Sequence, residues 1–187
     1  MKGFFQDKIL FAKLKSQDQA AFLEAYDRYV DKIYRFIFFK VGDAAEAEDL
    51  TSATFLKTWQ YIGQQETVDE KTLPALLYRI ARNVVIDHYR QSNKTEMVSI
   101  DEEESQTLVD LKQDPSEAFA LKADVEILHK RMKELKDEYR EVLIMRFVNE
   151  LSIAEIAEIL EKSKGNVRVL IFRATSALKE LMKEEKD

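Results

Sequence analysis

Apolar residues recur at steps of three and four along most of the chain, which is the spacing of the buried stripe of an amphipathic helix. The clearest stripe in the first half comprises Phe22, Tyr26, Tyr29, Val30, Ile33 and Ile37. A second helix is expected after Gly42 and Asp43, and a third near Pro74, because proline is tolerated in the first turn of a helix. These helices predict a compact bundle.

The second half repeats this periodicity in shorter segments. Helices are expected over residues 125–135 and 139–147. Ser152 and Glu155 have the spacing of a capping box, so a further helix is expected to begin there, and Ser163 can cap the last one. Two helices joined by so short a turn predict a helix-turn-helix.

Composition favours an all-α fold without metal or cofactor. The 187 residues include four glycines and two prolines, whereas tight hairpins and barrel corners need more of both. The lack of cysteine excludes disulfides and thiolate metal sites. His88 and His129 are too few for most metal or triad chemistry, and Glu46 and Glu48 cannot face each other on one helix as an acid and base. An enzyme is therefore not expected.

The N-terminal sequence favours a cytoplasmic protein. The chain begins Met-Lys-Gly-Phe-Phe, and charged residues follow within a few positions. The apolar segment of a signal peptide is therefore not expected. Nor does any stretch approach the ~18 uninterrupted apolar residues of a membrane span. Membrane insertion is not expected.

The formal net charge of −6 comes from the middle of the chain. Residues 1–92 hold 13 acidic and 13 basic residues, and residues 125–187 again hold 13 of each. Residues 93–124 hold nine acidic and three basic residues, with little apolar periodicity. This pattern predicts two small helical domains, over residues 1–92 and 125–187, joined by an acidic flexible linker over residues 93–124.

The third predicted helix carries a basic and aromatic face. Opposite its apolar side lie Arg79, Arg82, Asn83 and Arg90, with Tyr78 and Tyr89 beside them. Guanidinium groups bind phosphates and aromatic rings stack on unpaired bases, so the face is a candidate for single-stranded nucleic acid; the alternative is an ordinary solvated surface. His88 falls on the apolar side, where a packed, hydrogen-bonded histidine is expected.

The last predicted helix has the character of a DNA recognition helix. It projects Lys164, Arg168, Phe172, Thr175 and Lys179 away from its apolar stripe, and no acidic residue occurs between positions 162 and 179. Such a face suits the major groove, although a purely structural helical hairpin is the alternative. Glu161 stands where a turn glycine would fit, so a left-handed conformation there would cost roughly 1 kcal/mol.

Five short motifs occur along the chain. Each is weak alone, but their combined order and spacing are specific enough to indicate a family. They are DQAAF at 18–22, AEDL at 47–50, LYRIARN at 77–83, REVL at 140–143 and EIAE at 155–158. In this order the chain resembles the extracytoplasmic-function (ECF) group of bacterial RNA polymerase sigma factors, small members of the sigma-70 family with two helical domains. The resemblance implies a transcription initiation factor that directs polymerase to promoters.

The resemblance also assigns roles to positions. It implies that Glu48, Asp49, Leu50 and Phe55 dock on the clamp helices of the largest polymerase subunit, and that the second domain meets the flap region. The −10 promoter element would be bound and melted by Tyr78, Arg79, Arg82, Asn83 and Arg90, with a base captured by the preceding loop at about 61–72. The −35 element would be read in duplex form by Ser163, Lys164, Asn166, Arg168, Phe172 and Arg173. An anti-sigma factor is a further expected partner.

Two other functions are consistent with the residues alone. The chain could be a one-component helix-turn-helix regulator, in which the second domain binds DNA by itself and the first ignores polymerase. It could also be a helical interaction protein without DNA, for which the zero net charge of both domains is the best argument.

Overall fold

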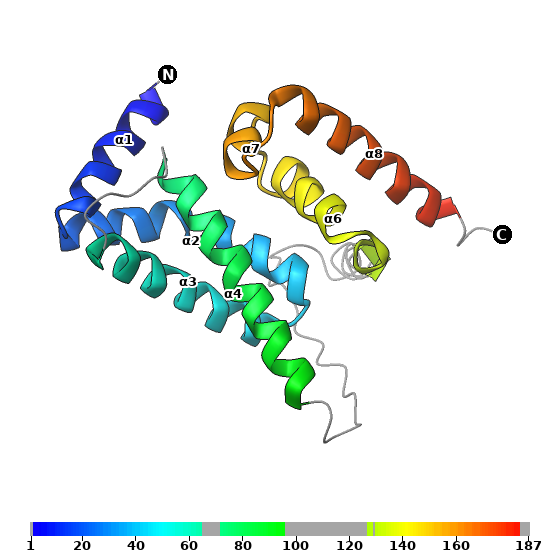
Figure 1. The fold of residues 1–187 in the computed structure, drawn as a ribbon, viewed down its shortest axis with the longest axis horizontal. Helices are drawn as coiled ribbons and strands as arrows, with labels where there is room; N and C mark the ends of the chain where they lie inside the picture. The colour runs from blue at the N-terminus through cyan, green and yellow to red at the C-terminus, as the bar shows by residue number, and fades with distance from the viewer. Residues whose placement is uncertain (1, 65–71, 96–126, 129, 184–187) are drawn as a thin grey trace, which may run out of the picture.

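A computed structural model describes residues 2–64, 72–95, 127–128 and 130–183, and its elements are all helical. The first group of helices consists of α1 (Lys2–Lys15), α2 (Gln19–Val41), α3 (Ala44–Gln64) and α4 (Leu73–Thr95). The second group consists of α6 (Asp137–Leu143), the π-helix η1 (Ile144–Val148), α7 (Ile153–Ile159) and α8 (Lys164–Lys183). Figure 1 shows α1–α4 as one bundle, with α6, α7 and α8 packed beside it. The all-α prediction is confirmed.

The predicted linker cannot be compared with the structure over most of its length. Residues 93–95 form the last turn of α4, and residues 96–124 lie outside the described residues. The limits of the two domains stay a prediction. Of the predicted base-capturing loop, residues 61–64 belong to α3 and residues 65–71 lie outside the described part of the chain.

Helix α2 forms the centre of the first group. Asp18 caps it by accepting hydrogen bonds from the backbone N–H groups of Ala20 and Ala21, and Gly42 ends it with a left-handed φ of 89°. Ile33 and Ile37 of the predicted stripe are fully buried. The pattern of apolar positions therefore identified much of the buried face of this helix, although Tyr26 of the stripe is 36% exposed and the buried Phe36 was not part of it.

Helix α1 was not among the predicted elements. It packs on α2 and α3 through Leu10, Phe11 and Leu14, which are all buried. Its Asp7 also forms an ion pair of 2.6 Å with Arg28 of α2. The bundle of the first group thus has four helices within the described residues.

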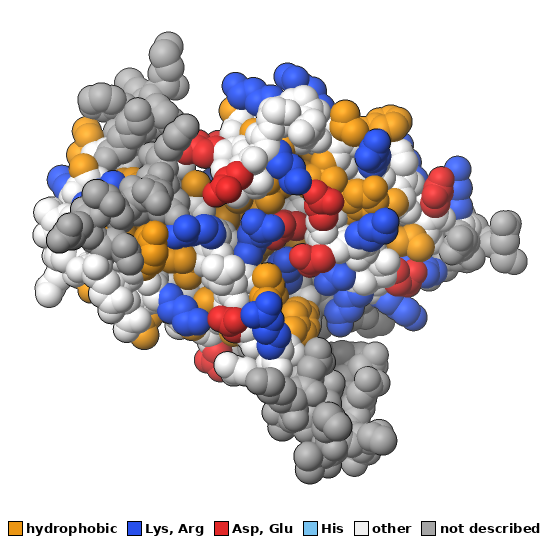
Figure 2. Space-filling view, in the orientation of Figure 1, with side chains coloured by type: hydrophobic (Ala, Val, Ile, Leu, Met, Phe, Trp, Pro, Cys, Tyr) orange, Lys and Arg blue, Asp and Glu red, His pale blue; other side chains and the backbone are white. Residues whose placement is uncertain are grey.

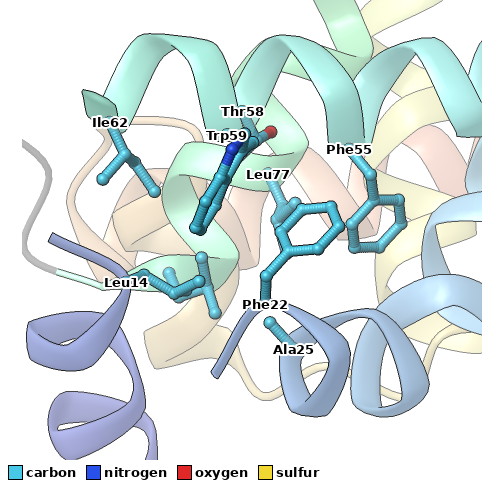
Figure 3. A pocket seen from close by; sticks show the side chains of 9 residues that line it. Leu14, Phe22, Ala25, Phe55, Thr58, Trp59, Ile62 and Leu77 are labelled. Carbon is cyan, nitrogen blue, oxygen red and sulfur yellow. The ribbon is translucent and has the colours of Figure 1, made fainter. Parts of the chain in front are cut away.

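A small apolar cavity lies between the helices of this bundle (Figure 3). Leu14, Phe22, Trp59 and Leu77 are among its lining residues, and the Phe22 and Trp59 rings lie 5.0 Å apart. The cavity has a volume of about 10 Å³. An enclosed water molecule needs about 10–15 Å³ and several polar partners. This cavity is too small for an organic ligand.

The second group contains the predicted helix-turn-helix. Ser152 accepts a hydrogen bond from the Glu155 N–H while the Glu155 carboxylate accepts one from the Ser152 N–H, so the capping box is confirmed. Glu161 is left-handed, with φ of 53°, and Ser163 accepts from the Asn166 N–H at the start of α8. Ala157 of α7 is buried, at 8% exposure.

Before the helix-turn-helix, the helix predicted over 139–147 changes its winding. It begins at Asp137 as α6 and continues from Ile144 as η1, where Asn149 ends it with its N–H bonded to the Ile144 carbonyl. Arg146 donates from its guanidinium to the Leu151 carbonyl, at 2.9 Å, and closes the following turn. The wider winding places Asn149 inside the molecule, with an exposure of 3%.

Candidate nucleic-acid interface

The apolar side of α4 packs in the core. Part of the opposite side of the helix is exposed to solvent. Ala81, Val84 and Val85 are buried, as predicted. Asn83 is exposed, and the Arg90 side chain is 75% exposed with Asp87 3.8 Å away. Both residues are therefore available to a nucleic acid.

Arg79 is held against the end of α3. The centre of its guanidinium lies 5.0 Å from the centre of the Tyr61 ring, in the geometry of a cation–π contact. This contact places a cation and an aromatic ring side by side, which is the combination that favours unpaired bases.

Tyr78 does not lie on the surface with the basic residues. It is 1% exposed, its ring packs edge-on against Phe36 at 5.1 Å, and its hydroxyl accepts a hydrogen bond of 2.6 Å from the side-chain amide of Asn149. Burial raises the pKa of Tyr78 above its ordinary range. The expectation of an accessible Tyr78 is wrong for this arrangement, because the second group of helices covers it.

Arg82 is half-buried at the same contact. Its Nε lies 2.8 Å from a carboxylate oxygen of Glu141 in α6, and its side chain is 37% exposed. The predicted phosphate ligand is thus paired with an acidic residue of the same chain.

Next to this contact, Tyr89 and His88 complete the α4 surface. The Tyr89 hydroxyl donates a 2.6 Å hydrogen bond to the Lys40 carbonyl, and the ring is 40% exposed. His88 Nε2 lies 3.3 Å from a carboxylate oxygen of Glu46. The His88 side chain is 23% exposed, so it is partly packed as expected. Within the described residues no three acidic or histidine side chains are grouped to hold a metal ion.

The α8 face is open to solvent at its N-terminal end. Its exposed members from the predicted set are Lys164, Asn166, Arg168, Phe172 and Arg173. Phe172 is 72% exposed, and Ser163 is engaged in capping the helix. Val169 is also exposed, whereas Leu170 belongs to the core. These predicted residues of α8 are therefore accessible to solvent, and their contact with DNA stays a prediction.

The predicted polymerase-docking residues divide between surface and core. Glu48 and Asp49 are exposed and Leu50 is half-buried. Phe55 is only 3% exposed and packs on the Tyr26 ring at 4.9 Å, so its side chain is not offered to a partner as it stands. The packing of α2 on α3 explains this position.

Leu23 of α2 and Leu56 of α3 are exposed apolar residues that the motif analysis did not single out for docking. Leu23 is not part of the predicted buried stripe of its helix, and its position off that stripe was the sequence signal that it is exposed. On the face shown in Figure 2, basic and acidic side chains are interspersed rather than gathered in one basic patch.

Comparison with protein families matches both groups of helices. The family model "Sigma-70 region 2" matches residues 25–95, and the model "Sigma-70, region 4" matches residues 126–178. The ECF RNA polymerase sigma factor SigM of Bacillus subtilis is 32% identical over 158 residues, which cover 84% of this chain and 93% of SigM. The chain belongs to the ECF RNA polymerase sigma factors. As a sigma factor, it directs promoter-specific transcription initiation.

Other members of this sigma factor family are similarly related. BldN of Streptomyces coelicolor is 32% identical over 182 residues, which cover 94% of this chain and 66% of BldN. SigW of Bacillus subtilis is 28% identical, with 92% and 94% covered. Sigma factors as a class are DNA-binding initiation factors without catalysis of their own.

Solved structures show the same fold. CnrH in complex with the cytosolic domain of CnrY has a TM-score of 0.69 at 21% identity, with 95% of this sigma factor and 97% of that chain covered. RpoE in complex with the anti-sigma factor NepR from Bartonella quintana has a TM-score of 0.64 at 22% identity, with 87% and 96% covered. Among the described helices of the sigma factor, none has the length and apolar character to cross a membrane.

Proposed function

We propose that this sigma factor binds core RNA polymerase and contacts promoter DNA through two separate surfaces. The α8 face binds the −35 element as a duplex, and the basic side of α4 binds the −10 element as a melted strand. The protein acts in the bacterial cytoplasm and has no catalytic activity.

The observation that carries this proposal is the open N-terminal end of α8. Lys164, Asn166 and Arg168 project from the first turns of a capped helix that follows a tight turn. A recognition helix enters the major groove in this way, with base contacts from its first turns and phosphate contacts around them.

The two surfaces suit different forms of DNA. Melting requires the unpaired strand to be bound more tightly than the duplex, by enough to offset a few kcal/mol per unstacked base. Arg79 with the Tyr61 ring provides a stacking and phosphate-binding pair for a single strand. A helix in the major groove prefers duplex and cannot supply that difference.

Polymerase docking is assigned to the exposed acids of α3. Glu48 and Asp49 suit a basic surface of the polymerase, and Leu50 lies beside them. The second domain binds the flap region of the polymerase. The relatives CnrH and RpoE were solved in complexes, and the partner of RpoE is an anti-sigma factor, which supports a partner of that kind for this protein.

Run-off transcription tests the proposal. Bacterial core polymerase is given a promoter library with and without the protein, and we expect initiation only in its presence. A variant with Asn83→Ala and Arg90→Ala should lose it, because both side chains are exposed on α4, and within the described part of the chain neither bonds to the second group. Lys183→Ala, at the far end of α8, is the control.

No stimulation at any promoter, together with retained duplex binding by the full chain, would instead identify a DNA-binding regulator. That outcome would leave the α8 assignment in place and remove the polymerase assignment.

A further inference from the structure

Val169 is an exposed apolar residue on the solvent-facing side of α8, the helix at the outer edge of the molecule in Figure 1. It is 49% exposed, whereas Val167, Leu170 and Ala174 on the opposite side of the helix are buried. The family motifs assigned neighbouring residues of α8 to the −35 element but not this one. Val169 is therefore a further candidate for contact with the promoter.

Val169 and Phe172 form an apolar strip along this side of α8. They are three positions apart, a spacing that brings side chains together on a helix, and Phe172 is 72% exposed. Gly165, one turn before Val169, presents no side chain in front of the strip. A Cβ atom built at Gly165 would contact the Ser163 hydroxyl at 3.8 Å, so the helix is open at this point.

Basic side chains border the apolar strip on both sides. At 3.6 residues per turn, Arg168 falls on one side of the strip and Arg173 on the other, and both are exposed. No acidic residue occurs between positions 162 and 179. Guanidinium groups bind phosphates and the edges of guanine bases, so both positions attract DNA. An apolar protein partner would instead bury both guanidinium groups without a counter-charge, which is unfavourable.

The chemistry of the strip selects among the bases of a duplex. In the major groove thymine is the base that presents a methyl group, whereas the edges of the other bases present hydrogen-bonding groups. Valine neither donates nor accepts a hydrogen bond. The amino group of a cytosine or adenine placed against it would lose water without gaining a partner, whereas a thymine methyl group is stabilised by leaving water.

We propose that Val169 is a specificity-determining residue for the −35 element, and that its side-chain methyl groups pack on the C5 methyl group of one thymine. This inference rests on the proposed function of α8 and names the base that this part of the helix selects. Phe172 adjoins the contact from the next turn, and Arg168 and Arg173 border it. The selected feature of the base is its methyl group.

Deoxyuridine isolates this methyl group, because it differs from thymidine only in lacking it. Each thymine of the −35 element recovered from the run-off library is replaced singly by deoxyuridine. The affinity of each promoter duplex is then measured for the full-length protein assembled with core polymerase. Val169→Ala removes the methyl groups on the protein side. Met182→Ala is the matched control, because Met182 is an apolar residue of the same helix with 38% exposure and lies near its other end.

In the parent protein we expect one deoxyuridine substitution to lower the affinity about fourfold, equivalent to about 0.8 kcal/mol, which is typical of one buried methyl-sized group. The same substitution should have no effect in Val169→Ala and its full effect in Met182→Ala. Val169→Ser introduces a hydroxyl that donates and accepts hydrogen bonds, so a promoter library selected with this variant should lose the preference for thymine at this position.

Three results would overturn the proposal, with folding of each variant verified by circular dichroism. They are a recovered −35 element without thymine, an affinity that no deoxyuridine substitution changes, and an equal loss in Val169→Ala and the parent, which would assign the methyl contact to another residue. If the parent protein initiates at no promoter, the proposed function fails instead. The deoxyuridine series on a duplex selected by the full chain alone then decides the role of Val169, and a lack of any duplex binding would overturn both.

Discussion

Glu161 holds the turn between α7 and α8 in a left-handed conformation, with φ of 53°. The Cβ atom makes this region unfavourable for residues other than glycine. We expect Glu161→Gly to raise the free energy of unfolding by about 1 kcal/mol, measured by urea denaturation. Glu161→Ala keeps the Cβ atom and is the control, so an equal gain in that variant would point to lost charge rather than relieved backbone strain.

Arg168 lies on the exposed face of α8 and is assigned to the −35 duplex. Arg168→Ala should weaken duplex binding by about 1–3 kcal/mol if the guanidinium contacts a base edge. Fluorescence anisotropy with a promoter recovered from the run-off library measures this, and Lys183→Ala serves as a control for the loss of one charge. Equal losses in both variants would argue for a general electrostatic effect and against a specific contact.

Whether a given side chain is exposed or buried was the hardest property to predict. Arg168 and Phe172 could be placed on the surface because helical periodicity alone sets their direction. Tyr78 could not, because it is buried against distant parts of the chain, including Asn149, which is 71 positions away in the sequence. Phe55 likewise belongs to a motif of the family and still packs on Tyr26 in the core.

The capping box at the start of α7 fixes the entry to the helix-turn-helix. Ser152→Ala removes an acceptor for the Glu155 N–H and should lower the free energy of unfolding by about 1 kcal/mol. Ser152→Asp retains an acceptor and should lose much less. Urea denaturation compares the two, and a similar loss in both would show that the serine is held by something other than capping.

Elements with a single clear stripe or cap were predictable, and those without one were not. Helix α2 has both, and much of its buried face was identified, including Tyr29, Ile33 and Ile37. In α1 the apolar residues point in several directions around the helix axis, so periodicity gives no signal there, and its burial depends on α2 and α3. The change to π-helix at Ile144 leaves no signature in periodicity over five residues.

Across the whole molecule, buried tyrosines couple stability to alkaline pH. Burial raises the pKa of Tyr29 and of Tyr78 above the ordinary value of 10, and a hydrogen bond to Asp7 adds to the effect at Tyr29. Since the neutral hydroxyl is favoured in the folded state, this stabilisation is full below pH 10 and is lost as the pH rises beyond it. Urea midpoints between pH 8 and pH 11, in steps, should therefore fall at the upper end.

Tyr29→Phe is the control for this pH dependence, because it removes the ionisable hydroxyl and keeps the ring. The decline of the midpoint above pH 10 should be shallower in this variant. An unchanged slope would assign the decline to other groups, such as the lysines.

The overall organisation followed from composition and spacing, whereas the docking of the two groups did not. Few glycines and prolines with helical periodicity were sufficient for an all-α fold of two domains. The contact between them includes polar pairs, such as Lys40 with Glu141, and such pairs carry no periodic pattern that a sequence could reveal.

The reactivity of Lys40 toward amine reagents should report whether the two groups of helices are in contact. Its amine is 3% exposed between α2 and α6, whereas lysines such as Lys164 and Lys179 on α8 lie at the surface. Reagents that acylate amines react with the solvated, deprotonated form, so they should modify the surface lysines first. Mass spectrometry of the acylated peptides would then follow the separation of the two domains without any introduced label, including inside an assembled transcription complex.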